Sequence, residues 1–92
     1  MIRAETVVIV SNPQGIHARP SALIVKAASR FTADVCIENP AEGCVVDAKS
    51  ILEVMTIVAP QGTELVVRAE GDDASAAVER LAGLIGSGFG ED

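Results

Sequence analysis

TVVIVSNPQGIHARP, residues 6–20, contains a change of sequence pattern from which the first three elements of the fold can be predicted. Residues 6–10 are almost all β-branched, which predicts a strand, and residues 11–15 are turn formers, which predict a loop. Apolar residues then recur at helical spacing across residues 18–30, with Pro20 in the first turn, where proline fits a helix. The stretch therefore predicts a strand, a loop and a helix in succession.

The middle of the chain has the pattern of a hairpin followed by a short helix. Residues 33–38 and 44–46 alternate like strands, and the turn formers of residues 39–43 join them. A short helix is expected to begin near Ser50, because a serine side chain can cap the first turn. The break at residues 60–62 should end it.

The last third predicts one more strand and one more helix. Residues 63–70 have the strand pattern, and apolar residues recur at helical spacing across residues 77–85. The acids of residues 71–73 are expected at the positive end of that helix. The glycine-rich tail, residues 86–92, should end the helix and remain disordered.

The resulting order, β-α-β-β-α-β-α, lacks consecutive β-α-β units. It predicts an α+β fold, an open-faced β-sandwich in which a four-stranded antiparallel sheet carries three helices on one face. We expect residues 1–92 to form a single domain, because half of so short a chain would not bury a core.

Composition excludes several classes of function. The net charge of −6 repels phosphate backbones, so nucleic acid is not an expected partner. The apolar runs are too short to span a membrane, and the first residues lack the layout of a signal peptide, so a cytoplasmic protein is expected. One histidine and two cysteines, Cys36 and Cys44, do not make a zinc site; free thiols and no metal or cofactor are expected.

His17, the only histidine, stands where the predicted loop meets the first helix. Unpaired N–H groups and the helix dipole attract anions to such a place, so backbone N–H groups near Ala18 and Arg19 could hold a phosphate on the ring. The planar fork of Arg19 suits phosphoryl oxygens, and neutral imidazole is nucleophilic near neutral pH. The residues alone leave open the alternative that His17 is a helix cap or a surface group.

Residues 15–20, Gly-Ile-His-Ala-Arg-Pro, resemble the phosphorylation motif of the HPr family, Gly-(Leu/Ile)-His-x-Arg-Pro. The resemblance runs from about residue 5 to residue 86. It implies a phosphocarrier of the bacterial sugar phosphotransferase system. His17 would accept a phosphoryl group on Nδ1 from phosphorylated enzyme I, charged by phosphoenolpyruvate, and pass it to an enzyme IIA. Such a carrier turns over phosphate but is not a stand-alone enzyme. The sequence does not decide between the sugar-uptake and nitrogen-regulatory branches.

A second match, residues 47–55, resembles the segment around the regulatory serine of the family. The resemblance implies that an HPr kinase/phosphorylase could modify Ser50, that phosphoserine would impair transfer through His17, and that a transcription regulator could be a partner. The alternative is that Ser50 is only a helix cap. Glu53 departs from the small or basic residue common at its place, which puts a negative charge on the presumed docking face.

The resemblance also implies a docking patch for enzyme I and enzyme IIA. It would comprise Ile16, Ala18, Ala22, Lys26, Lys49, Ile51, Leu52 and Met55. The apolar residues of so short a helix cannot all face inward, which favours an exposed patch with basic residues around it. The alternative buries Leu52 and Met55 in the core. Transient docking favours a monomer.

Two other functions remain open at this point. A purely regulatory protein of the same fold would act through phosphorylation of His17 or Ser50 and a change in partner binding. A ferredoxin-like domain that binds a small molecule would show ligand-dependent stability and no phosphoprotein. Replacing His17 with alanine separates the carrier from the regulator, because only phosphotransfer would be lost.

Overall fold

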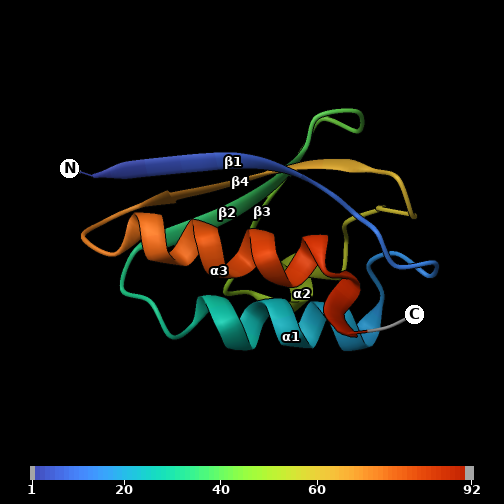
Figure 1. Ribbon diagram of the computed structural model, residues 1–92, viewed down its shortest axis with the longest axis horizontal. Helices are drawn as coiled ribbons and strands as arrows, with labels where there is room; N and C mark the ends of the chain where they lie inside the picture. The colour runs from blue at the N-terminus through green and yellow to red at the C-terminus, as the bar shows by residue number, and fades with distance from the viewer. Residues whose placement is uncertain (1, 91–92) are drawn as a thin grey trace.

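The computed structural model describes residues 2–90 and is shown in Figure 1. The elements are β1 (Arg3–Ile9), α1 (Ala18–Ala28), β2 (Asp34–Asn39), β3 (Cys44–Asp47), α2 (Ile51–Val54), β4 (Glu64–Glu70), α3 (Ala74–Gly86) and a short 3₁₀ turn, η1 (Gly88–Gly90). The predicted order of strands and helices is confirmed. No helix within residues 2–90 is long and apolar enough to cross a membrane.

The four strands form one sheet in the order β1-β4-β2-β3, with every neighbouring pair antiparallel. β4 is therefore central although it comes last in the chain, and its Arg68 lies opposite Glu5 of β1 and Cys36 of β2. The helices α1, α2 and α3 all lie on one side of the sheet (Figure 1). This is the predicted α+β open-faced sandwich.

The hydrophobic core fills the space between the sheet and the helices. Alternate residues of β4 point into it, and Leu65 and Val67 are completely buried, as is Ile37 of β2. The helices contribute Ile24 of α1 and Leu81 of α3, both also fully buried. Each such side chain contributes roughly 1.5–3 kcal/mol of transfer free energy, so this one layer of aliphatic contacts holds the helices on the sheet.

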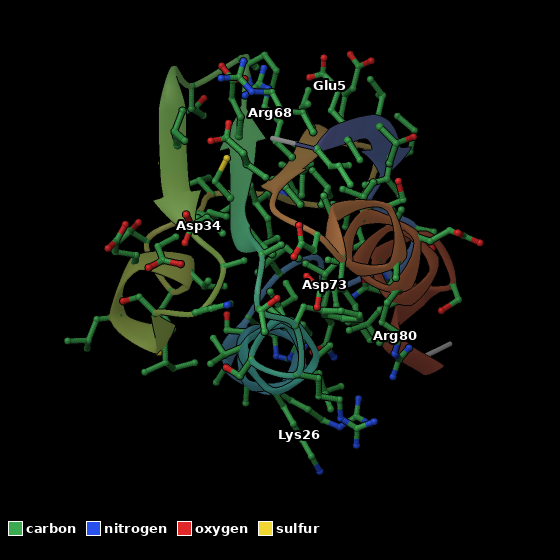
Figure 2. The ribbon with its side chains drawn as sticks, turned by 90° about the vertical axis from the view of Figure 1, so that its left-hand side faces the viewer. Glu5, Lys26, Asp34, Arg68, Asp73 and Arg80 are labelled. Atoms are coloured by element: carbon green, nitrogen blue, oxygen red, sulfur yellow. The ribbon has the colours of Figure 1, made fainter. Side chains whose placement is uncertain are left out.

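Asp73 is the N-cap residue of α3, so an acid stands at the positive end of this helix as predicted, but its side chain makes no capping hydrogen bond. The helix begins at Ala74, and its first turn contains no acidic residue. The Asp73 carboxylate instead accepts hydrogen bonds from the backbone N–H groups of Thr32 and Ala33, at 2.9 and 2.8 Å. In Figure 2, Asp73 lies between the ends of α1 and α3. Asp73 therefore lies at the positive end of α3 while its carboxylate binds a segment that is distant in the sequence.

The expected disorder of the tail is wrong for its part up to Gly90. Phe89 is only 3% exposed and takes a φ of +60°, between two glycines that also have positive φ. The Ser11 hydroxyl donates a 2.8 Å hydrogen bond to the carbonyl of Gly86, which ties the end of α3 to the loop after β1. Burial of one aromatic ring explains why the segment is ordered. Residues 91–92 lie outside the described part.

Candidate functional site

The loop that leads into α1 is held by a close approach between two backbone segments. Gly15 has a φ of +68°, and a Cβ atom there would stand 2.3 Å from the carbonyl oxygen of Ala59 and 2.8 Å from Cα of Pro60. The next N–H, that of Ile16, donates to the same Ala59 oxygen at 3.0 Å. Only glycine therefore fits here, and the segment after α2 fixes the approach to His17.

Two asparagines strengthen this arrangement, and sequence reasoning did not assign them a role. Asn12 is buried, and its Nδ2 donates to the Gly15 carbonyl at 2.7 Å, while its own carbonyl accepts from the Gly15 N–H at 3.1 Å. Asn39, at the end of β2, is also buried and donates to the carbonyl of Val58 at 2.8 Å. The turn-forming character of Asn12 was visible in the sequence; the partner of Asn39 was not.

His17 occupies the N-cap position of α1, half-buried and with an extended backbone (φ −139°, ψ −164°). Its carbonyl accepts the first bond of the helix, from the Ser21 N–H at 2.9 Å. Ala18 and Arg19 follow on the exposed side, while Pro20 is buried and anchors the turn. The first turn of an eleven-residue helix thus follows His17 directly, which places the positive end of the helix dipole next to this residue.

Ser50 caps the short helix α2. Its hydroxyl accepts a hydrogen bond from the Glu53 N–H at 3.3 Å, as the sequence predicted for a serine at this place. The Glu53 carboxylate turns back toward β3 and accepts from the Asp47 N–H at 3.0 Å. The acidic group that departs from the family pattern is therefore engaged with the turn before α2.

Apart from buried Val54, the apolar side chains of α2 and that of Met55 after it are exposed. Leu52 is 79% exposed, Met55 56% and Ile51 39%, so the alternative that buried Leu52 and Met55 in the core is wrong. α1 and α2 contact each other, which brings these residues near α1. On α1, Ala18, Ala22 and Lys26 recur every fourth residue and are all exposed, and Ile16 before the helix is half-buried.

Lys49 differs from the other residues of the predicted docking patch. Its ammonium group donates a 2.7 Å hydrogen bond to the carbonyl of Phe31, just beyond the end of α1, and the residue is half-buried. Its backbone N–H donates to the Asp47 carboxylate at 2.9 Å. Lys49 therefore ties the approach to α2 to the end of α1, in addition to any contact with a partner.

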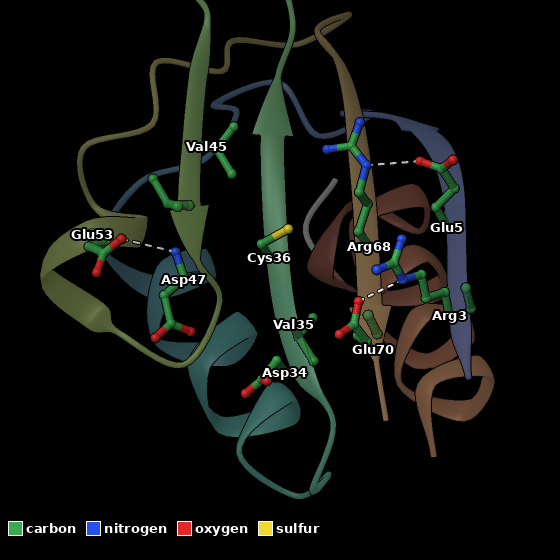
Figure 3. Close-up of a pocket in the computed structure, with 13 residues that line it drawn as sticks. Arg3, Glu5, Asp34, Val35, Cys36, Val45, Asp47, Glu53, Arg68 and Glu70 are labelled. Carbon is green, nitrogen blue, oxygen red and sulfur yellow. Dashed lines mark hydrogen bonds and ion pairs between the residues drawn. The ribbon is translucent and has the colours of Figure 1, made fainter. Parts of the chain in front are cut away.

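A broad hollow lies away from His17, on the face of the sheet that no helix covers (Figure 3). It has a volume of about 830 Å³. Ion pairs cross it, between Arg3 and Glu70 at 2.7 Å and between Arg68 and Glu5 at 2.9 Å. Within residues 2–90 no group of acidic, histidine and cysteine side chains could hold a metal ion. Such exposed pairs stabilise the sheet only weakly.

The thiols are free and do not face each other. Cys36 lies opposite Asp47 in the β2–β3 pair, and Cys44 lies opposite Asn39. Partial burial raises the pKa of the Cys36 thiol, and the neighbouring Arg68 only partly offsets this. Cys36 is therefore a poor nucleophile at neutral pH.

Comparison with known proteins identifies the family. Residues 4–87 match the family described as "PTS HPr component phosphorylation site". The chain is 39% identical over 84 residues to the phosphocarrier protein HPr of Xylella fastidiosa, covering 91% of this chain and 92% of that protein. A crystal structure of HPr from Thermoanaerobacter tengcongensis superimposes with a TM-score of 0.88 at 39% identity, covering 97% of this chain and 98% of the other.

A longer relative contains a similar region. The chain is 35% identical over 88 residues to a multiphosphoryl transfer protein of Haemophilus influenzae, and this match covers 95% of the chain but only 18% of that protein. The family match spans the loop before α1, His17 and α2, and the fold agrees with that of the solved relative. The chain belongs to the HPr family of phosphocarrier proteins of the phosphotransferase system.

Proposed function

We propose that this protein carries a phosphoryl group on Nδ1 of His17. Phosphorylated enzyme I, charged by phosphoenolpyruvate, is the donor, and an enzyme IIA is the acceptor. The observation that supports this most strongly is the position of His17 at the N-terminus of α1, in a loop fixed by Gly15 and Asn12 and within the family's phosphorylation motif. The protein acts as a monomer that meets its partners one after another.

The transfer requires little chemistry from the chain. The lone pair of His17 Nδ1 forms the new P–N bond while the bond from phosphorus to the donor breaks, and that electron pair returns to the donor. Backbone N–H groups near Ala18 and Arg19, with the Arg19 guanidinium, stabilise the negative charge on the phosphoryl oxygens. In the second transfer the acceptor forms its own bond to phosphorus while the P–N bond breaks. The electron pair of that bond returns to Nδ1, which regenerates neutral imidazole.

The docking patch, the eight residues named above from the loop before α1, from α1 and from the segment around α2, supplies the surface for both partners. Its apolar centre around α2 is exposed and therefore contributes little to the core. Exposed apolar side chains bordered by basic residues are typical of a site for transient protein partners. An acidic rim on the partner would pair with Arg19 and Lys26.

A two-stage transfer experiment tests this function. The chain is charged with labelled phosphoenolpyruvate and enzyme I, separated, and mixed with enzyme IIA of the same organism. We expect the label to appear on the wild-type chain and then on enzyme IIA, and the His17→Ala variant to take up none while remaining folded. Labelling of enzyme I without transfer to the wild-type chain would contradict the proposal and favour a regulatory protein.

Ser50 is the proposed point of regulation, by an HPr kinase/phosphorylase, with a transcription regulator as the further partner. Its hydroxyl already accepts from Glu53 N–H, and the Glu53 carboxylate is held nearby on Asp47. A phosphoryl group there would add about two negative charges next to Glu53 and beside exposed Ile51 and Leu52, and so disfavour docking of an acidic partner.

Ser50→Asp should therefore raise the KM for enzyme I, while Ser50→Ala should lower stability by about 1 kcal/mol through loss of the cap and leave KM unchanged. Steady-state phosphorylation of His17 and urea unfolding measure the two effects. Equal KM values for all three proteins would reduce Ser50 to a helix cap.

A further inference from the structure

Three basic residues line a shallow hollow between α1 and α3, away from the uncovered face of the sheet. Lys26 and Arg30 come from α1 and Arg80 from α3; all three are exposed. They border a hollow of about 150 Å³, which we call the basic hollow; its other lining residues are Leu23, Ala27 and Leu84. Figure 2 shows Lys26 and Arg80 at the opposite end of the view from Glu5 and Arg68.

The positive charges of the basic hollow have no acidic partner within an ion-pair distance among residues 2–90. The chain has 13 acidic and 7 basic residues, and two arginines of the sheet face, Arg3 and Arg68, are paired with glutamates. Within residues 2–90, in contrast, Lys26, Arg30 and Arg80 form no ion pair. Three neighbouring cations without acids repel one another, so an anion from outside the chain would stabilise this place.

The size and lining of the basic hollow limit what that anion can be. A volume of about 150 Å³ is well below the 300–1,000 Å³ of a drug-sized pocket, and a water molecule takes about 30 Å³. The guanidinium forks of Arg30 and Arg80 suit phosphate oxygens. Leu23 and Leu84 are half-buried and offer apolar surface to a short carbon chain.

We propose that the basic hollow is a second anion site that binds a compact organic phosphate, one phosphate group on about three carbons. Lys26 lies roughly 12 Å along the helix axis from Ala18, so the site is separate from the first turn of α1. The bound phosphate pairs with Arg30 and Arg80, and its carbon atoms lie against Leu23 and Leu84. The proposal does not depend on phosphorylation of His17.

An NMR titration of the full chain with glycerol 3-phosphate tests this site. We expect saturable shifts of the backbone amides of residues 23–30 and 80–84, no shifts with glycerol, and weaker binding of inorganic phosphate. Arg80→Gln should raise the Kd roughly tenfold, the loss of one charge-assisted hydrogen bond. Arg3→Gln, which removes a paired arginine from the sheet face, should leave the Kd unchanged.

A second variant, Arg80→Glu, provides an independent check of the site. Arg80→Glu should abolish binding and raise the Tm of the ligand-free protein, because the new carboxylate pairs with Lys26 and Arg30. The proposal is overturned if glycerol 3-phosphate causes no saturable shifts or shifts only residues around His17. It is also overturned if Arg80→Gln binds as tightly as wild type, or if inorganic phosphate binds equally well.

Discussion

Gly15 sets the geometry of the histidine loop at the scale of a single residue. Its positive φ alone would favour glycine, and the 2.3 Å approach of a Cβ atom to the Ala59 oxygen excludes any larger residue. Gly43, in the β2–β3 turn, has nearly the same φ, +64°, but open space around it. Replacing Gly43 therefore tests backbone strain alone, whereas replacing Gly15 tests backbone strain together with the contact to Ala59.

Gly43→Ala should lower the free energy of unfolding by about 1–2 kcal/mol, the cost of a left-handed backbone for an L-residue. Gly15→Ala should lower it further, because the segment around Ala59 must also move, and only this variant should slow phosphorylation of His17. Urea unfolding and the initial rate with enzyme I measure both effects. Equal rates for the two variants would contradict the role given to the Gly15–Ala59 contact.

The elements are joined by contacts between segments that lie far apart in the sequence. Asp73, before α3, holds the Thr32–Ala33 segment that follows α1, and these hydrogen bonds lower the pKa of its carboxyl below the ordinary value of 3.8. A lowered pKa means that the folded state favours the ionised group. The stabilisation is therefore complete above the pKa of the unfolded chain and is lost as the pH falls through the lower pKa of the folded protein.

Asp73→Asn should accordingly destabilise the protein at neutral pH, and its difference from wild type should shrink as the pH falls below 3.8. Urea unfolding over a pH series measures this. Asp72→Asn, at the exposed neighbouring position, controls for the loss of one negative charge. If the difference in unfolding free energy between wild type and Asp73→Asn stays constant as the pH falls below 3.8, the role assigned to these hydrogen bonds is refuted.

The η1 turn is the second such contact, because it closes the end of α3 over the histidine loop. Gly88 lies close to Ser11 and Asn12, and buried Phe89 anchors it. Figure 1 shows this end of the chain at the same end of the molecule as the loop before α1. Order in η1 is thus coupled to the loop that positions His17.

Phe89→Ala should destabilise the protein by about 3–5 kcal/mol and slow phosphorylation of His17 even where the chain remains folded. Phe89→Leu, which keeps most of the apolar volume, should recover most of both losses. Leu81→Ala in the core of α3 provides a comparable loss of stability without this contact. If Leu81→Ala slows phosphorylation as much as Phe89→Ala, the effect comes from a general loss of stability. The inferred coupling between η1 and the histidine loop is then wrong.

The whole molecule has two unlike sides. The covered side of the sheet carries the helices, the histidine and the exposed apolar residues of α2, while the uncovered side carries ion pairs across the strands, with Val7 as an exposed apolar residue. Because the proposed docking patch lies on the helix side, partner recognition should depend on that side.

Leu52→Thr should leave stability nearly unchanged, because the side chain is 79% exposed, and should raise the KM for enzyme I several-fold. Val7→Thr makes a similar change on the uncovered side, where Val7 is 54% exposed, and should leave KM unchanged. Steady-state kinetics with purified enzyme I measure both variants. A larger change in KM for Val7→Thr than for Leu52→Thr would place docking on the uncovered side of the sheet and contradict the proposed patch.

Local patterns predicted the elements well because each has a clear period or cap. Strand alternation, the Ser50 cap and the turn at Gly15 depend on neighbours in the chain, and all are present. Contacts between distant segments were missed, such as the pairing of Asp73 with Thr32. The burial of Phe89 was missed for the same reason, because composition alone predicts a frayed tail. The positioning roles of Asn12 and Asn39 likewise became visible only with the fold.

Locating the phosphate on the chain is the strongest test of the claim that His17 carries the phosphoryl group. The chain is charged with phosphoenolpyruvate and enzyme I, digested under alkaline conditions that preserve phosphohistidine, and sequenced by tandem mass spectrometry. We predict one added phosphoryl group, labile to acid and confined to His17. A charged enzyme I together with an unmodified His17 peptide, or a phosphate on another residue, would contradict the claim.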